Sequence, residues 1–210
     1  MRLQLVETAA RLLDEHGRDG VTVRSLAREV GASTQAVYTH FDGVDAVLLE
    51  VCREAFRRFG AALDEPAVTD DPVADWMTQG WGYRRFALRN PHLYHAMFGA
   101  GLAELRYQRP EDVDAAACTF LSLLVRLERC RDSGRWTVDD VFTSGEVVWA
   151  VVHGHLQIEL TGYFASMGRD AGATFEAASR RVALGFGDDP ALINVSIRKA
   201  RRRAQTADRN

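Results

Sequence analysis

The sequence predicts an all-helical fold. Apolar residues recur at the i, i+3, i+4 spacing of a buried helix face, as in the run from Val47 to Phe59. Alternating apolar and polar runs bounded by Asn-Gly turns, which mark β-hairpins, are absent from the 210 residues. Pro and Gly interrupt the helical patterns, for example at Asn90-Pro91 and Ser133-Gly134. A chain of this length can form a small domain and a larger one.

The helical patterns follow one another with short breaks. A first helix is expected over 2–16, ending at Gly17, and a long one from Val44 to just before Pro66. Two short helices lie between them, over 22–30 and 33–41. Later helices are expected over 72–89, 92–98, 112–132, 138–165 and 173–186, with a polar link over 106–111 and Thr137 capping the helix that begins at 138.

We therefore divide the chain into three parts. Residues 1–46 form a helix-turn-helix domain, and 47–190 form a larger helical domain. Residues 191–210 form a basic tail, which we expect to be disordered because its Arg and Lys residues have few apolar anchors.

The segment 22–41 is the most informative part of the chain. Leu26, Ala27 and Val30 share one apolar face, and Gly31 can end that helix in the left-handed conformation. Ser33 can cap the next helix. Its apolar residues point to the core and its polar ones outward; the apolar set is Ala36, Val37 and Phe41, and the polar set is Thr34, Gln35, Tyr38, Thr39 and His40. Two helices joined by a short turn containing Gly form a helix-turn-helix unit.

These residues are also where the chain resembles a known family. Five elements stand in the order and spacing of the N-terminal domain of TetR-type bacterial repressors: Leu5-Val6 with Ala9-Ala10 and Leu12-Leu13, then Gly17, then Val21-Thr22-Val23 with Leu26-Ala27, then Val30-Gly31-Ala32-Ser33, then Val37-Tyr38 with His40-Phe41. The resemblance covers residues 2 to 50. It implies a transcriptional repressor that binds operator DNA as a homodimer.

The exposed side chains of the two short helices are the candidate DNA contacts. Gln35 can pair with adenine and Thr34 can touch a thymine methyl, so both are placed at base edges. The resemblance places Tyr38 and His40 at phosphates, and Thr39 has the same donor chemistry. Thr22 and Arg24 are candidate phosphate contacts on the first helix, and Ser33 is a weaker candidate because it caps.

One position departs from the family pattern. Members often carry a Lys after the His-Phe pair, where it meets a phosphate, but this chain has Val44 followed by Asp45. One phosphate contact is therefore expected to be missing, which lowers the affinity and the salt dependence by about one charge.

Composition fits a globular DNA-binding protein without proving one. The chain is 47% hydrophobic and 26% charged, and its net charge of -3 does not by itself indicate a nucleic-acid binder. No signal peptide and no membrane-length apolar run is visible, so we expect a cytoplasmic protein without membrane contact. No cofactor is expected.

The second half resembles the Trp-His-Gly subgroup of TetR C-terminal domains through Trp149, His153 and Gly154. The resemblance implies an unidentified small-molecule effector. An aromatic and Met-rich set with a few polar groups suits such a site. The candidate ligand-binding residues are Trp81, Phe86, Tyr94, Met97, Phe98, Phe120, Trp149 and His153.

The resemblance also implies that the last two helices build a four-helix bundle with a second subunit. The candidate dimer residues are Val147, Val148, Val151, Val152, Leu156 and Leu160 on one helix, with Val182, Ala183 and Phe186 on the other. A dimer places two reading helices one DNA turn apart, ~34–36 Å, and so requires a near-palindromic operator.

Two alternatives stay open. A metal- or redox-responsive DNA-binding sensor is suggested by His155 and Glu159 on one helix face and by Cys52, Cys118 and Cys130, although helical patterns favour buried free thiols. A small helical enzyme is the other, but no nucleophile–base pair is evident, so no catalytic residue and no metal ligand is assigned.

Overall fold

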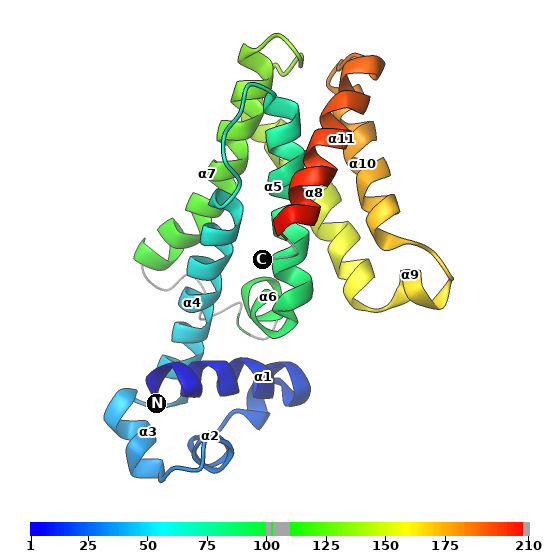
Figure 1. Cartoon of the computed structure of the whole chain (residues 1–210). Coiled ribbons are helices and arrows are strands. Elements are labelled where there is room, and N and C mark those ends of the chain that lie inside the picture. Colours follow the sequence, from blue (N-terminus) through cyan, green and yellow to red (C-terminus); the bar gives the residue numbers. More distant parts are fainter. Residues whose placement is uncertain (100–101, 103–109, 208–210) are drawn as a thin grey trace. The chain divides into compact units, whose positions relative to one another are not determined.

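The computed structural model describes residues 1–99, 102 and 110–207, and these are helical without a strand, as the sequence predicts (Figure 1). The helices are α1 (Arg2–Gly20), α2 (Val23–Glu29), α3 (Thr34–His40), α4 (Val44–Asp64), α5 (Pro72–Arg89), α6 (Pro91–Phe98), α7 (Pro110–Asp132), α8 (Val141–Leu160), α9 (Tyr163–Ser166), α10 (Ala171–Gly185) and α11 (Pro190–Ala207). None of them is long and apolar enough to cross a membrane.

The chain divides into two compact units. The first contains Met1–Gly60 and Arg89–Cys118, and the second contains Ala61–Leu88 and Thr119–Asn210. Helix α4 runs without interruption across the expected boundary between residues 46 and 47. The division of the chain into functional domains at that boundary therefore remains a proposal.

In the first unit, α1 packs against α2 and α6, and α2 packs against α3. The core is made by Leu5, Leu26, Val37 and Leu48, which are all fully buried. Such burial stabilises the unit because apolar area leaves water. The break expected at Gly17 is present: this residue has φ 69° inside α1, which only Gly adopts freely.

Two histidines join α6 to α1. The Nδ1 atoms of His92 and His95 hydrogen-bond the two oxygens of the Asp14 carboxylate, His92 at 2.6 Å. Burial would raise the pKa of Asp14, but the hydrogen bonds from His95 and His92 outweigh it and the pKa is lowered.

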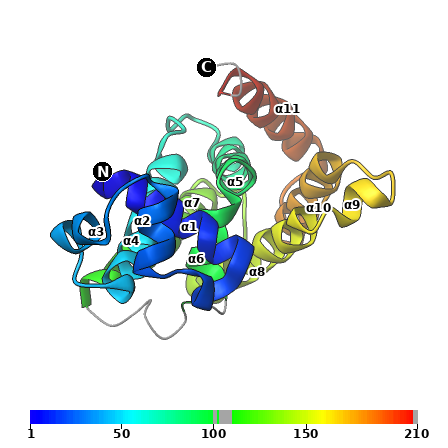
Figure 2. The same cartoon turned by 90° about the horizontal axis from the view of Figure 1, so that it is seen from below.

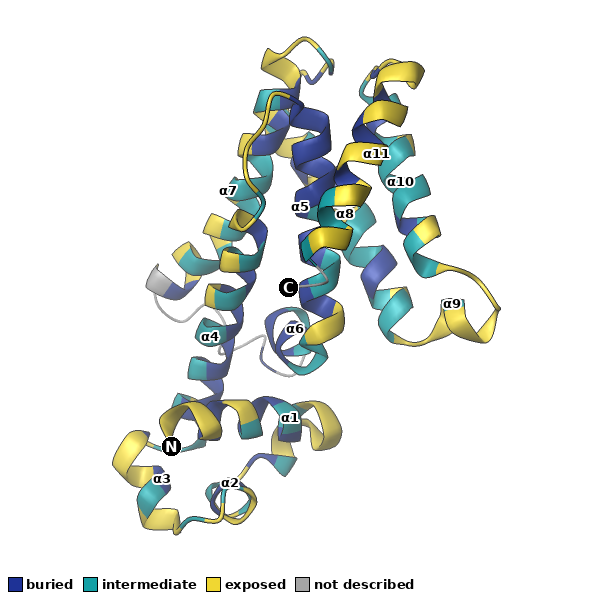
Figure 3. Ribbon diagram, viewed as in Figure 1, coloured by how far each residue is buried: buried dark blue, intermediate teal, exposed yellow. Residues whose placement is uncertain are grey.

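In the second unit, α5 is buried along most of its length (Figure 3). Its Val73 and Trp76 join a core with Leu127, Val148 and Ile193. The rings of Trp76 and Trp136 meet edge to face at 5.0 Å. Helix α10 packs against both α8 and α11.

The expectation that the C-terminal tail is disordered is wrong for residues 191–207. They belong to α11, and Ile193, Ile197 and Ala200 are buried along one side of it. Basic residues of the helix bind two carboxylates at the start of α5: Lys199 Nζ donates to Asp71, just before the helix, at 2.9 Å, and Arg203 Nη1 donates to Asp75 in its first turn at 2.7 Å. The tail is therefore held in place by carboxylates that lie far away in the sequence, and a local sequence pattern does not show such partners.

Three other local expectations differ from the structure. The long helix α8 is capped by Asp140, whose carboxylate accepts from Phe142 N at 2.9 Å, while the Thr137 N–H donates to Phe186 O. That helix ends at Leu160, because Gly162 has φ 76°. Helix α7 begins at Pro110, so the expected polar link over 106–111 ends earlier, and its residues 106–109 lie outside the described part.

Candidate nucleic-acid interface

The turn between α2 and α3 has the geometry that the sequence predicts. Thr22 Oγ1 accepts from Ser25 N at 3.0 Å and Ser25 Oγ accepts from Thr22 N at 2.9 Å, so the two residues close α2 in a capping box. Gly31 has φ 66°, and Ser33 Oγ accepts from Ala36 N at 3.2 Å. The cap at Ser33 was predicted, whereas the box at Thr22 was missed because its partner is Ser rather than the usual Glu or Gln.

Helix α3 lies beside α2 in the first unit (Figure 2), and it buries one side and exposes the other (Figure 3). Val37 is 0% exposed and Phe41 is buried, while Tyr38 is 54% exposed although it is a large aromatic side chain. All the candidate DNA contacts are exposed: Thr22, Arg24, Ser33, Thr34, Gln35, Tyr38, Thr39 and His40. Val37 and Phe41 therefore anchor α3 while its polar side is free to enter a groove.

Two of these hydroxyls already have partners in the free protein. Thr39 Oγ1 donates to Gln35 O at 3.0 Å, and Thr22 Oγ1 lies 3.1 Å from Ser25 Oγ. Either hydroxyl would have to rotate to donate to a phosphate. By contrast, no hydrogen bond holds the Gln35 side chain to another described residue, so its amide can meet a base edge.

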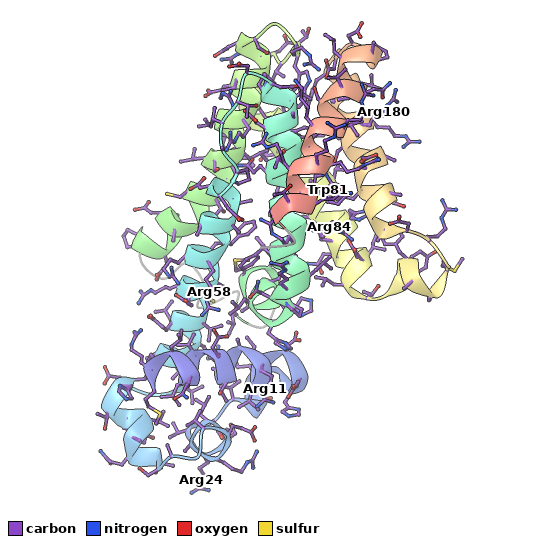
Figure 4. All side chains as sticks on the ribbon, in the orientation of Figure 1. Arg11, Arg24, Arg58, Trp81, Arg84 and Arg180 are labelled. Carbon is purple, nitrogen blue, oxygen red and sulfur yellow. The ribbon has the colours of Figure 1, made fainter. Side chains whose placement is uncertain are left out.

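The unpaired positive charge of this surface lies on α2, from which Arg24 extends (Figure 4). Arg11 pairs with Glu29 at 2.7 Å and Arg18 pairs with Asp45 at 2.8 Å, so acids already neutralise these two arginines. No ion pair joins Arg24 to another described residue, and Arg28 makes only a long contact of 3.4 Å with Glu29. Two arginines on α2 thus supply most of the free charge for phosphates.

The candidate effector residues fall into separate groups. Tyr94 and Met97 are fully buried in the first unit, where the Phe98 ring meets Tyr94 at 5.0 Å and Phe56 at 6.1 Å. In the second unit, Phe120, Trp149 and His153 form one surface cluster: the Trp149 ring lies 6.5 Å from Phe120 and 5.4 Å from His153. Trp149 is 39% exposed.

A third group surrounds Trp81 (Figure 4). Its ring packs on Phe175 at 5.2 Å and lies under the Arg84 guanidinium, 5.5 Å away. Arg84 in turn donates to both carboxylate oxygens of Glu159, with Nε at 2.9 Å. Phe86 is buried. The structure thus places Tyr94, Met97 and Phe98 in the first unit and the other five candidates in the second, where Phe120, Trp149 and His153 form one cluster.

The candidate dimer residues also separate. Val148, Leu156 and Ala183 are buried within the chain itself and serve its core. Val147 is exposed on α8, as are Trp149 and Ile158. Gly154 has open space where a side chain would stand. Val147, Gly154 and Ile158 share one side of α8, which is the apolar surface that a second subunit could cover, whereas Trp149 lies on the opposite side.

The structure gives little support to the metal-responsive and redox-responsive alternatives. Among the described residues, no three His, Cys, Asp or Glu side chains are grouped so that they could hold a metal ion. Glu159, which shares a helix face with His155, is paired with Arg84. Cys52 and Cys130 are buried free thiols as expected, but Cys118 is exposed, so the expectation of a buried thiol is wrong there. Burial raises the pKa of the Cys130 thiol far above its usual value, which makes it unreactive.

Sequence reasoning missed a polar cluster in the core of the second unit. Asp75 is buried among Trp76 and Met77, and Arg126 is buried beside Leu127. The positions three or four away are themselves largely polar, with Thr78 and Gln79 after Asp75 and with Ser122 and Arg129 around Arg126, so no local pattern indicated that these charges would be buried.

Comparison with known proteins identifies both halves of the chain. Residues 5–51 match the family model of bacterial regulatory proteins of the tetR family, and residues 76–182 match the tetracyclin repressor-like C-terminal domain.

Individual relatives support the same family assignment. The HTH-type transcriptional regulator Rv1816 of Mycobacterium tuberculosis is 27% identical over 210 residues, covering 84% of this chain and 88% of the relative. The HTH-type transcriptional repressor AcnR of Corynebacterium glutamicum is 26% identical over 186 residues, covering 85% and 86%. The structure of a protein with unknown function from Rhodococcus sp. RHA1 superimposes with a TM-score of 0.76 at 25% identity, covering 88% of this chain and 94% of that one.

Proposed function

The chain belongs to the TetR family of DNA-binding transcriptional regulators, and we propose that it is a repressor that a small molecule releases from its operator. The observation that carries this proposal is the surface of α3. A short helix anchored by Val37 and Phe41 presents Gln35 and Tyr38 outward, next to the uncompensated Arg24 of α2. The name of the relative AcnR supports repression as the sign of the regulation.

The proposed DNA contacts fall into two kinds. Thr34 and Gln35 read base edges, with Ser33 beside them as the cap that orients the first turn of α3. Phosphates are contacted from both helices by Thr22, Arg24, Tyr38, Thr39 and His40. Because α2 offers only Arg24 without an ion pair and Arg28 with a long one, a single domain has few phosphate contacts, so a homodimer on a near-palindromic operator supplies the affinity.

The second unit is the proposed place of effector binding and dimerisation. Its exposed α8 side, with Val147 and Ile158 around Gly154, suits a partner helix that approaches closely. The cluster of Phe120, Trp149 and His153 is the part of the candidate effector set that forms a continuous aromatic surface. The same Trp149, His153 and Gly154 support our proposal that this domain belongs to the Trp-His-Gly subgroup.

A DNA-binding experiment tests the function. The purified protein is titrated against the intergenic DNA beside its own gene, followed by fluorescence anisotropy at two or more salt concentrations. Tight, sequence-selective and salt-sensitive binding is expected. Binding that does not distinguish this DNA from a scrambled duplex of the same composition would refute the proposal.

Two single variants separate base reading from phosphate binding. Gln35→Ala should lose ~1–3 kcal/mol on the operator and relax the preference at one base pair. Arg24→Ala should weaken operator and scrambled duplex alike and lower the salt slope by about one. Arg131→Ala is a suitable control, because Arg131 is an exposed arginine on α7, away from α2 and α3 in the sequence.

A further inference from the structure

Arg126 on α7 is buried in the core of the second unit without a full set of hydrogen-bond acceptors. The residue is 7% exposed, and its Nη2 donates to Pro66 O at 3.3 Å. Its Nη1 is buried, and no described protein group accepts a hydrogen bond from it. A guanidinium has five donors and loses several kcal/mol when it is buried with donors unmet, so folded proteins seldom keep such a group without a use.

The carboxylates nearest to Arg126 do not accept its remaining hydrogen bonds. Asp75 is 0% exposed and accepts four hydrogen bonds, from Thr69 N, Thr69 Oγ1, Arg129 Nη1 and Arg203 Nη1, at 2.7 to 2.8 Å. These fill the four acceptor positions of a carboxylate. Asp64 accepts from Ser122 Oγ at 3.0 Å and is exposed.

Charged groups of both signs act on Arg126. Among them are the carboxylates of Asp75 and Asp64 and the guanidiniums of Arg129 and Arg203. Burial lowers the pKa of Arg126, and the neighbouring Arg129 and Arg203 lower it further, while Asp75 and Asp64 act in the opposite direction.

Neutral polar groups lie near Arg126. Ser122 stands one helical turn before Arg126 on α7, and its Oγ accepts from Gln79 Nε2 at 2.9 Å. Leu127 follows Arg126 in α7 and belongs to the buried apolar core together with Trp76 and Met77. A guanidinium pairs with a planar carboxylate through two parallel hydrogen bonds.

We propose that Arg126 binds the carboxylate of a small monocarboxylic acid with an apolar body, and that such an acid is the effector of this regulator. The inference rests on the proposed function, because it names the chemical class of the ligand that controls DNA binding.

The binding test uses thermal unfolding of the full chain. Wild-type protein is heated with millimolar hexanoate or benzoate, with the matched amides hexanamide and benzamide, and with sulfate at equal ionic strength. At least one acid is expected to raise Tm by roughly 2–4 °C or more. The amides and sulfate are expected to leave Tm unchanged, because they cannot form the charged planar pair.

Variants assign the effect to one side chain. Arg126→Met and Arg126→Gln should abolish the rise in Tm, whereas Arg131→Met, an exposed arginine of the same helix, should keep it. Without ligand, both Arg126 variants should be at least as stable as the wild type, because a buried unmatched cation is removed. A structural role for Arg126 predicts the reverse.

Several results would overturn the inference. These are no rise in Tm with either acid, an equal rise with an amide or with sulfate, a rise that survives in Arg126→Gln, or a clear loss of stability in both ligand-free variants. The operator titration is measured separately, with and without the acid. Operator binding without any response to acids would reject the inference alone, and acid binding without operator binding would reject the proposed function alone.

Discussion

Asp75 offers the sharpest test of how the second unit is held together. Its carboxylate is fully buried and accepts from Thr69, Arg129 and Arg203, so Asp75→Asn would place an amide N–H₂ against donors and leave two guanidiniums without their counter-charge. Breaking a buried pair from one side costs about 3–5 kcal/mol. The side chains of Arg129 and Arg203 are 30% and 26% exposed, so water compensates part of the loss and the lower end, about 3 kcal/mol, applies.

This loss is measurable by chemical and thermal unfolding. For a chain of this size, about 3 kcal/mol lowers Tm by roughly 6–12 °C. Asp70→Asn is the matched control, since Asp70 is exposed five residues earlier, and it should change stability by less than about 0.5 kcal/mol. A loss below about 1 kcal/mol for Asp75→Asn would refute the view that this carboxylate organises the cluster.

The pH dependence gives a second check on Asp75. Burial would raise its pKa, but the hydrogen bonds from Thr69, Arg129 and Arg203 outweigh burial and lower it. A carboxylate whose pKa is lower in the folded state stabilises the fold above its unfolded pKa, about 4, and this contribution is lost as the pH falls through the folded pKa. The difference in stability between wild type and Asp75→Asn should therefore shrink below pH 4.

Three further predictions concern single positions. Gly31→Ala should destabilise the protein by about 1–2 kcal/mol in urea unfolding, because φ is 66° there; no change would mean that the turn relaxes. Burial lowers the pKa of His155, so as the pH falls the unfolded chain binds a proton at this residue before the folded chain does. The free energy of unfolding should therefore decrease as the pH drops below about 6.5. His155→Gln should make Tm less dependent on pH in this range, and an unchanged dependence would contradict the assignment. Asp14→Asn should cost about 1 kcal/mol at neutral pH. Because the pKa of Asp14 is lowered in the folded state, this cost should begin to shrink below about pH 4 and be lost as the pH falls through the lowered pKa; a cost that stays constant across the acid range in denaturant titrations would refute this.

The helix-turn-helix could be predicted almost completely from the sequence. The spacing of Leu26 and Val30, the glycine at 31 and the cap at Ser33 are local signals, because helix hydrogen bonds and caps join residues three or four positions apart. The same reasoning failed at the start of α8, where Thr137 and Asp140 are both good caps and the contact of Thr137 with Phe186 decided between them.

The effector candidates show the limit of composition. Aromatic residues were selected by type, and type does not tell a core residue from a surface one. Tyr94 is fully buried while Trp149 is 39% exposed, and only the packing of the helices distinguishes them.

The sequence by itself determined that the chain is helical, where most helices begin and end, and which side of α3 faces outward. Tertiary structure alone decided which charges meet. Asp14 finds His92 and His95 on α6, Asp75 finds Arg203 at the far end of the chain, and Arg126 is left with an unmatched donor. The physical reason is that an ion pair depends on distance in space and on burial, and neither is written in local spacing.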